Sequence, residues 1–456
     1  MPAMMPGDAA RIVARIERLP NSPWHLRMRA VVGVTYFFDG FDALTIAFVL
    51  PALIPLWHLG PVQIGTLIAT GYAGQALGSV FFGWLAERIG RVPCALASCA
   101  IFSVFSLACA FSPGLDWLIA LRFLQGLGLG GEMPVMQSYL NEFSRTHRRG
   151  RFALLTQLPF AFGIAVTSLV AAFVVPAFGW QWMFVIGALP GFITLFMRRV
   201  LPESPRWLVS AGRADDAARV MDRIEASITA SGIALPPLGA VVREAEPARG
   251  GFADLFRGVY KRRTLTIWAL WICTYLVSYG LSAWMPSLYR TVYKLPVDVA
   301  LRYGVYTSVA LFLGGCLLTA TIDLVGRRVW IGAALLISGL VLVGLYQAPV
   351  MQPWNVMMIS LVPFFGIGAI SLVLGSYTAE NYPTSLRALG TGVGNAWLRA
   401  TSVGGPYLVG WMITTQGLGG VFVMFGAVAA LGGAVALLFA TETNERLLEE
   451  VSPVVG

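Results

Sequence analysis

Apolar residues of this chain fall into long stretches that short polar segments separate. A helix needs about 20 apolar residues to cross the roughly 30 Å hydrocarbon core of a bilayer. Twelve stretches are suitable for such helices, and they cover residues 28–56, 62–85, 93–111, 115–141, 152–174, 179–197, 264–289, 301–322, 329–348, 354–376, 386–412 and 418–440. The first and the eleventh are long enough to be tilted or broken. The pattern predicts an all-α membrane protein with twelve transmembrane helices.

Two charge patterns occur twice at nearly half the chain length. The turn with Glu87, Gly90 and Arg91 returns 236 residues later with Asp323, Gly326 and Arg327. A second pair, Glu142 with Arg149, returns 238 residues later as Glu380 with Arg387. Parallel repeats of this kind are typical of transporters that bind their substrate between two bundles. We therefore expect two pseudo-symmetric halves of six helices each, and transport as the function.

One long polar segment divides the two halves. It covers residues 198–263 and separates an N-terminal unit, 1–197, from a C-terminal unit, 264–456. Within it, residues 213–224 place Val220, Met221 and Ile224 on one side of a predicted surface helix. The segment is therefore expected to be a linker with short amphipathic helices.

Composition and charge agree with a membrane protein. Hydrophobic residues make up 57% of the chain and charged residues 12%, with a mean hydropathy of +0.72, whereas about a quarter of a soluble protein is charged. The net charge is +9, and 27 of the 32 Lys and Arg residues lie in the N-terminus, the C-terminus and the loops on one side. This positive-inside bias places both termini in the cytoplasm and makes a nucleic-acid partner unnecessary.

Several alternative chemistries are disfavoured by the sequence. The chain has two lysines, Lys261 and Lys294, and neither follows a glycine, so it has no ATP-binding P-loop. Residues 126–131 match a dinucleotide-binding pattern, but they lie in an apolar span and are expected to pack helices. The five cysteines have no metal-ligand spacing. No cofactor, no metal and no enzymatic activity are expected.

Ionisable side chains inside the predicted spans are the main functional candidates, because burying a charge in hydrocarbon is costly. They are Asp39 and Asp42 in the first span, Arg122 and Glu132 in the fourth, and Arg399 in the eleventh. The two aspartates lie three residues apart on one helix face, where repulsion between like charges favours protonation of one. The alternative is that Arg122 holds both ionised. Glu132 is expected nearer the cytoplasm, with either a proton-coupling or a structural role.

Arg399 is the candidate for substrate recognition, since its guanidinium fork matches a carboxylate. The competing interpretation is a fixed counter-ion for a buried acid. Aromatic side chains at a similar depth would form a flat apolar pocket for a small ring. The candidates are Tyr36, Tyr275, Tyr279 and Trp397.

The repeated charges at the cytoplasmic face are expected to gate rather than to touch substrate. They would link the two halves in the outward-open state and separate on inward opening. The candidate gating residues are Glu87, Arg88, Arg91, Glu142, Arg149, Asp323, Arg327, Glu380 and Arg387.

These features together resemble the major facilitator superfamily over nearly the whole chain. Residues 83–91 resemble its inter-helix signature, residues 202–208 its sugar-porter P-E-S-P-R-[WF]-L motif, and residues 380–387 its E-x-x-P-T-x-x-R element. Residues 39–42 resemble the D-G-x-D motif of bacterial aromatic-acid/proton symporters, and residues 126–134 and 397–406 resemble niacin transporters and the organic-ion branch.

The resemblance also implies roles for individual residues. Organic-anion members carry an arginine at the position of Arg399, and in proton-coupled sugar porters an acid of the first helix pairs with the arginine matching Arg122. Gln157 matches a sugar-contacting glutamine, but residues 274–280 lack the paired glutamines of sugar porters.

The resulting hypothesis is a proton-coupled symporter of the bacterial inner membrane. It would import a small organic anion, such as nicotinate or a hydroxybenzoate, as a monomer in the bilayer. The alternatives are a sugar or polyol porter, export of a hydrophobic compound, and a non-transporting membrane sensor.

Overall fold

A computed structural model describes residues 6–20, 22–143, 149–192, 200–238 and 251–443. All its secondary structure in this part of the chain is helical, and the expected fold class of twelve membrane helices is confirmed. The first half contains α2 (Pro23–Trp57), α3 (Pro61–Ile89), α4 (Arg91–Ala110), α5 (Leu115–Phe143), α6 (Arg149–Phe178) and α7 (Gln181–Gly187). The second contains α11 (Gly258–Thr291), α12 (Val297–Val325), α13 (Arg327–Gly344), α14 (Pro353–Glu380), α15 (Thr384–Thr415) and α16 (Gly417–Phe439).

Hydropathy alone would identify fewer spans than the fold contains. Eight described helices are long and apolar enough to cross a membrane by length and composition, but α3, α5 and α15 are not among them. These three helices carry Gln75, Arg122, Glu132 and Arg399, so polar side chains that face other helices lower their mean hydropathy. The sixth span, expected over 179–197, begins as α7 and its last residues lie outside the described part.

The repeated turns have the same backbone geometry in both halves. Gly90 ends α3 with φ +103°, and Gly326 ends α12 with φ +87°. L-residues with a Cβ rarely adopt this region, and glycine does so without steric cost. In each turn the next helix begins one residue later, at Arg91 or Arg327. The repeat seen in the sequence is therefore a repeat of the local chain path.

Glycines allow α5 to pack closely against its neighbours. A Cβ on Gly126 would lie 2.2 Å from the carbonyl oxygen of Gly71, and one on Gly130 would lie 2.0 Å from that of Gln75. A Cβ on Gly128 would lie 2.4 Å from the amide nitrogen of Phe102 on α4. The G-x-G-x-x-G pattern is thus a helix-packing surface, as expected.

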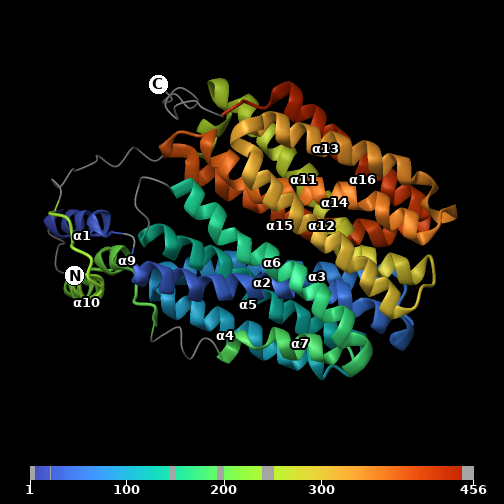
Figure 1. Ribbon diagram of the computed structural model, residues 1–456, viewed down its shortest axis with the longest axis horizontal. Helices are drawn as coiled ribbons and strands as arrows, with labels where there is room; N and C mark the ends of the chain where they lie inside the picture. Colours follow the sequence, from blue (N-terminus) through green and yellow to red (C-terminus); the bar gives the residue numbers. More distant parts are fainter. Residues whose placement is uncertain (1–5, 21, 144–148, 193–199, 239–250, 444–456) are drawn as a thin grey trace.

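The two halves lie side by side, with the blue-to-green helices in one bundle and the yellow-to-red helices in the other (Figure 1). They meet mainly where α3 packs on α15, α6 on α12 and α2 on α11. Gly65 is in close contact with the carbonyl of Pro406, and Gly410 with the carbonyl of Pro61. Both contacts are near the end of the bundle opposite Gly90, so the halves are closely packed at that end.

Three short helices gather at one end of the bundle, beside the first half (Figure 1). They are α1 (Pro6–Arg18), α9 (Pro205–Ser210) and α10 (Ala214–Ala230). The amphipathic helix expected at residues 213–224 corresponds to α10, which buries Met221, Ile224 and Ile228, while Val220 is partly buried. A 3-10 helix, η1 (Phe252–Phe256), precedes α11, and another, η2 (Leu345–Val350), follows α13.

Candidate functional site

Asp42 lies at the centre of a buried polar cluster in the first half. Its Oδ2 is 3.2 Å from Nη1 of Arg122, and Nε2 of Gln125 donates to its Oδ1 at 2.8 Å. Arg122 also donates to Oε1 of Gln125 at 2.8 Å. The Arg122 guanidinium fits beside Gly71, where an added Cβ would lie 3.1 Å from Nη2. Its Cζ lies 5.9 Å from the centroid of the Phe184 ring. Arg122 therefore pairs with Asp42 rather than holding both aspartates.

Asp39 has a different environment from Asp42. It is buried, yet in the described residues its carboxylate accepts no hydrogen bond. The charges that act on it most strongly are those of Arg399, from the other half, and Asp42. Asp39 is thus within the electrostatic influence of both Arg399 and Asp42.

Glu132 is a further buried acid whose carboxylate has no hydrogen-bond partner among the described residues. It is 2% exposed. The nearby Thr35 hydroxyl donates to the carbonyl of Val32 at 2.9 Å. Asp39 and Glu132 both act electrostatically on Tyr36. An ionised carboxylate without a partner is costly to bury, so this environment suits a neutral, protonated acid.

Arg399 makes a direct polar contact between the halves. Its Nη1 donates to Oε1 of Gln75, on α3, at 2.9 Å. Gln75 is 7% exposed, and its Nε2 has no hydrogen-bond partner in the described part of the chain. Sequence reasoning missed both Gln75 and Gln125, because a neutral amide in an apolar helix carries little signal of its own.

Two predicted tyrosines lie near this contact. Tyr279 faces Tyr72 across the halves, with ring centroids 5.0 Å apart, and stacks on Tyr275 at 6.0 Å. The charges of both Arg399 and Asp39 reach Tyr279. The Tyr275 hydroxyl is already occupied, since it donates to the carbonyl of Ser371 at 2.9 Å. Tyr72 and Tyr279 therefore form an aromatic pair between the halves, and the Arg399 charge acts on Tyr279.

The other predicted pocket residues are placed differently. Trp397 packs on Trp268, with ring centroids 5.6 Å apart. It is two residues from Arg399 on the same helix, a rotation of about 200°, so the two side chains leave the helix on nearly opposite sides. Tyr36 donates to Oε1 of Gln137 at 3.3 Å and belongs with the buried acids. The side chain of Gln157 lies outside the described residues.

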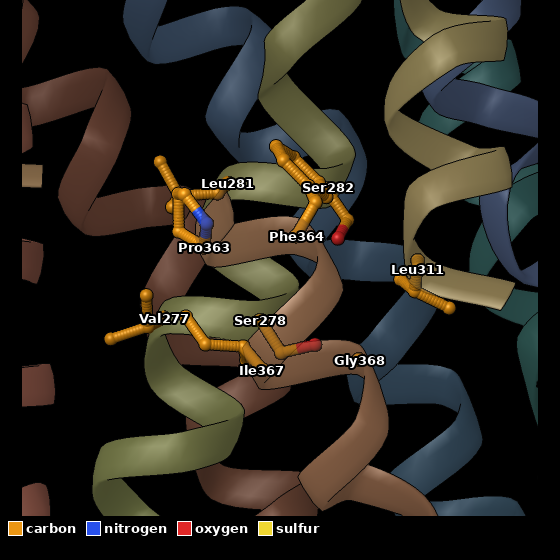
Figure 2. A pocket seen from close by; sticks show the side chains of 9 residues that line it. All are labelled: Val277, Ser278, Leu281, Ser282, Leu311, Pro363, Phe364, Ile367 and Gly368. Atoms are coloured by element: carbon orange, nitrogen blue, oxygen red, sulfur yellow. The ribbon is translucent and has the colours of Figure 1, made fainter. Parts of the chain in front are cut away.

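One small cavity lies within the second half, between α11, α12 and α14 (Figure 2). Its volume is about 10 Å³, and the hydroxyl groups of Ser278 and Ser282 are among its lining groups. This volume holds at most one water molecule. It is too small for an aromatic acid and is separate from the Arg399 contact.

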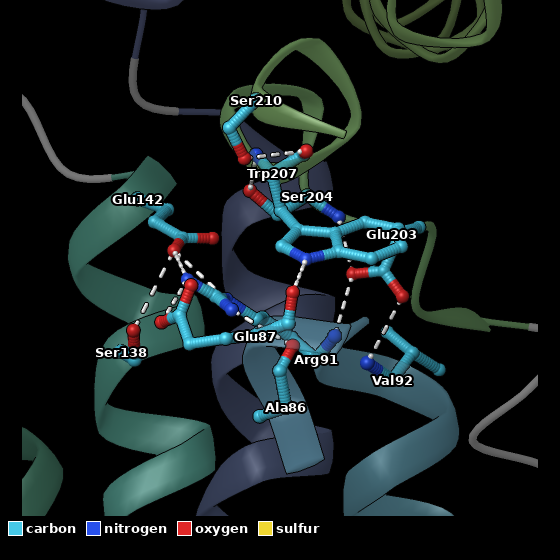
Figure 3. Close-up of polar contacts among 10 residues, drawn as sticks. All are labelled: Ala86, Glu87, Arg91, Val92, Ser138, Glu142, Glu203, Ser204, Trp207 and Ser210. Atoms are coloured by element: carbon cyan, nitrogen blue, oxygen red, sulfur yellow. Dashed lines mark hydrogen bonds and ion pairs between the residues drawn. The ribbon is translucent and has the colours of Figure 1, made fainter. Parts of the chain in front are cut away.

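The charges around Gly90 form a compact cluster in the first half (Figure 3). Arg91 donates from Nε to Glu142 at 3.0 Å and from Nη1 to the carbonyl of Ala86 at 2.8 Å, and its Nη2 lies 3.0 Å from Glu87. Arg88 instead lies over the Trp84 ring, at 4.0 Å from its centroid.

Glu203 of the linker caps the beginning of α4. Its oxygens accept from the backbone amides of Arg91, at 3.0 Å, and Val92, at 3.2 Å (Figure 3). Burial raises the pKa of this carboxyl, and the amide donors partly counteract the rise. The Trp207 indole donates to the carbonyl of Glu87 at 3.1 Å and fixes α9 on the same turn.

The second half repeats this arrangement. Arg327 lies 2.8 Å from Asp323 and 3.5 Å from Glu380. Glu442 accepts from the backbone amides of Arg327, at 2.9 Å, and Arg328, at 3.1 Å, as Glu203 does in the first half. Glu442 was not among the predicted residues, although residues 441–443 read T-E-T where residues 202–204 read P-E-S.

The described ion pairs lie within the halves. Each one, Arg91 with Glu87 or Glu142 and Arg327 with its two acids, joins helices of one half. The link between the halves was expected in the outward-open state, and it stays a prediction because this structure is closed at the end opposite Gly90. Arg387 lies in the first turn of α15, and the side chain of Arg149 is outside the described residues. The clusters therefore brace each half separately.

Comparisons with known proteins agree along almost the full length. A profile of the sugar (and other) transporter family matches residues 56–455. The niacin transporter NiaP of Acinetobacter baylyi is 33% identical over 442 residues, which cover 96% of this chain and 99% of that protein. The 4-hydroxybenzoate transporter PcaK of Pseudomonas aeruginosa is 29% identical over 428 residues, covering 90% of this chain and 92% of the relative.

Solved structures support the same fold. The crystal structure of a D-xylose–proton symporter superposes with a TM-score of 0.71 at 17% identity, covering 93% of this chain and 99% of the other. An inward-open structure of the Escherichia coli xylose transporter XylE gives 0.70 at 18% identity, covering 93% and 98%. The chain therefore belongs to the sugar (and other) transporter family of the major facilitator superfamily, and it is a multi-pass plasma-membrane transporter rather than an enzyme.

Proposed function

We propose that this transporter is a proton-coupled symporter that imports a small aromatic monocarboxylate, such as nicotinate or a hydroxybenzoate. The observation that carries the proposal is the contact of Arg399 with Gln75, beside Tyr72 and Tyr279 and within the electrostatic reach of Asp39. A partly buried guanidinium between two halves suits an anion, and aromatic rings suit a flat ligand.

The coupling role is assigned to the buried acids. Asp42 is paired with Arg122, whereas Asp39 and Glu132 have no hydrogen-bond partner in the described residues. A group that gains or loses a proton needs an environment in which neither form is strongly fixed. Asp39 is therefore the leading proton carrier, with Glu132 as a second site.

The names of two relatives support the substrate class. One is a niacin transporter and the other a 4-hydroxybenzoate transporter, and both substrates are aromatic rings with one carboxyl group. The structural likeness to a xylose symporter supports the fold and does not favour a sugar. We further propose cytoplasmic termini, the unit boundaries at 197/198 and 263/264, and a gating role for the charge clusters at Gly90 and Gly326.

The direct test is uptake of labelled nicotinate, 4-hydroxybenzoate and xylose into proteoliposomes with and without an inward proton gradient. We expect accumulation of an aromatic acid that a protonophore abolishes. Accumulation of xylose alone would instead identify a sugar porter.

Arg399 provides the sharpest residue test of this function. Removing one partner of a buried charged contact costs about 2 to 5 kcal/mol, and each 1.4 kcal/mol is about tenfold in affinity. Arg399→Ala should therefore weaken nicotinate binding more than tenfold, and Arg399→Lys should recover little because it lacks the planar fork. Binding is measured by calorimetry against nicotinamide, the neutral analogue. Equal losses for acid and amide would identify Arg399 as a structural counter-ion.

A further inference from the structure

The contact between Arg399 and Gln75 leaves one donor without a partner. A guanidinium has only donors, so Gln75 must turn its oxygen toward Arg399, and the amide cannot flip while this bond exists. The bond length is 2.9 Å. Nε2 of Gln75 is then a buried donor with no partner in the described residues, on a side chain that is 7% exposed. Buried polar groups normally have partners, so this one is available for a ligand.

The backbone holds Gln75 in this position. A Cβ on Gly130 would lie 2.0 Å from the Gln75 carbonyl oxygen, and one on Gly126 would lie 3.2 Å from its amide nitrogen. Gln75 therefore lies where α3 and α5 touch, and its backbone has little room to shift away. The unfilled donor belongs to the first half, whereas Arg399 belongs to the second.

We propose that the substrate carboxylate is bound from both halves at once, with one oxygen on the Arg399 guanidinium and the other on Nε2 of Gln75. This inference rests on the proposed function and adds Gln75 as the second binding group. A carboxylate has only acceptors and can satisfy both donors, whereas a primary amide would present its own NH₂ group to one of them. Gln75 thereby contributes to the selection of an acid over an amide.

A bridging carboxylate also explains how occupancy is communicated. In the structure, the Gln75 oxygen is the acceptor that Arg399 uses. Binding adds to this single contact an ion pair with Arg399 and a hydrogen bond from Nε2 of Gln75 to an ionised acceptor, so both halves hold the ligand. The ligand thus draws α3 and α15 together only when its carboxylate reaches both residues.

The test compares nicotinate and nicotinamide binding by calorimetry in the purified full-length wild type, Gln75→Ala, Arg399→Ala and the double variant. We expect Gln75→Ala to weaken nicotinate about tenfold and nicotinamide less than about twofold. The double variant should lose less than the product of the two single losses, because both groups bind one carboxylate. Gln63→Ala is the matched control and should bind like wild type, because Gln63 is exposed and lies at the end of α3 opposite Gly90.

Two further variants keep the test informative if Gln75→Ala is poorly folded. Gln75→Met keeps the size and removes the donor, so it should behave like Gln75→Ala. Gln75→Glu supplies an acid that pairs with Arg399 itself and should weaken nicotinate more than tenfold. Thermal unfolding in detergent identifies the variants that are folded.

The outcomes separate this inference from the function it rests on. If Gln75→Ala and Gln75→Met bind nicotinate as wild type does while Arg399→Ala loses it, the two-sided contact is wrong and the carboxylate transporter stands. If wild type does not prefer nicotinate or another aromatic acid to its amide, both are wrong.

Discussion

At the scale of single residues, the two aspartates of α2 are distinguished by their partners. Asp42 is bound by Arg122 and Gln125, and Asp39 is bound by neither. Two aspartates three residues apart on one helix therefore have different roles, because neighbouring helices supply hydrogen-bond partners for Asp42 only.

Neutralising each aspartate should give a different phenotype. Asp39→Asn should fold normally but lose the response of uptake to a proton gradient, since it cannot exchange a proton. Asp42→Asn leaves Arg122 buried without a counter-charge, which costs about 3 to 5 kcal/mol, so its melting temperature should fall markedly. Uptake in proteoliposomes and thermal unfolding measure the two effects. Proton-driven accumulation by Asp39→Asn at the wild-type level would exclude Asp39 as the carrier.

At the scale of elements, one acid of the linker and one acid that follows α16 stabilise the repeated turns. Glu203 caps α4 and Glu442 caps α13, each with two backbone amides. The first four amides of a helix have no partner within the helix, and a carboxylate there also compensates the helix dipole.

Replacement of either cap should lower stability with little effect on ligand affinity. Glu203→Gln and Glu442→Gln should each cost about 1 to 2 kcal/mol, because a charged acceptor of two amides is replaced by a neutral one. Glu87→Gln is the control, since this acid is 68% exposed and such pairs contribute about 0.2 to 1 kcal/mol. Thermal unfolding and nicotinate binding are compared; a selective loss of binding would place these caps in the substrate pathway.

The attachment of α1 to α10 should depend on pH. Burial disfavours the ionised form of Glu225, but hydrogen bonds from Arg15 and Arg18 outweigh it and hold the pKa of this carboxyl below its ordinary 4.5. Because the pKa of Glu225 is lower in the folded state, its contribution to the stability of the α1–α10 attachment is complete at pH values above the unfolded-state pKa. The contribution is lost as the pH falls through the folded-state pKa.

Hydrogen exchange of α1 amides therefore tests this attachment. Protection should be constant from neutral pH down to about 5 and should decrease at lower pH. Glu225→Gln should show the low protection at every pH, whereas Asp215→Asn, whose side chain is on the same helix and exposed, should match wild type. Equal protection in Glu225→Gln and wild type would show that apolar packing alone holds α1.

At the scale of the whole molecule, the two halves are closed together at the end opposite Gly90. Gly410 is in close contact with Pro61, because a Cβ added to Gly410 would lie 2.6 Å from the Pro61 carbonyl oxygen. That oxygen belongs to the backbone and cannot rotate away as a side chain could. Alternating access requires that this α3–α15 contact open in the other state. The α3–α15 contact can close because Gly410 has no side chain.

A larger residue at this contact should shift the population toward the state that is open at this end. Gly410→Leu should lengthen the distance between spin labels at Val62 and Trp411, both exposed, in a Cys316→Ser background. Gly404→Ala is the control on the same helix, because a Cβ there meets nothing within 4 Å. An unchanged distance in Gly410→Leu would mean that the contact does not control closure.

The sequence alone determined the features that depend on local chain chemistry. Apolar stretches of membrane length predict the helices, because backbone groups in hydrocarbon must bond within their own segment. The offset of the repeats predicted the pairing of Gly90 with Gly326, and the cost of burying charge identified Asp39, Asp42, Arg122, Glu132 and Arg399. The roles of Gln157 in substrate binding and of Arg149 in gating stay predictions, because their side chains lie outside the described residues.

Only the tertiary structure decided which of these groups meet. Whether Arg122 bonds Asp42 or Asp39 depends on the rotation and spacing of α2 and α5, which glycine contacts fix and hydropathy does not describe. Gln75 became a candidate because α3 and α15, more than 300 residues apart in the chain, bring its oxygen to Arg399 and leave its nitrogen without a partner. A neutral amide acquires a function only from its neighbours, so no pattern along the chain marks it in advance.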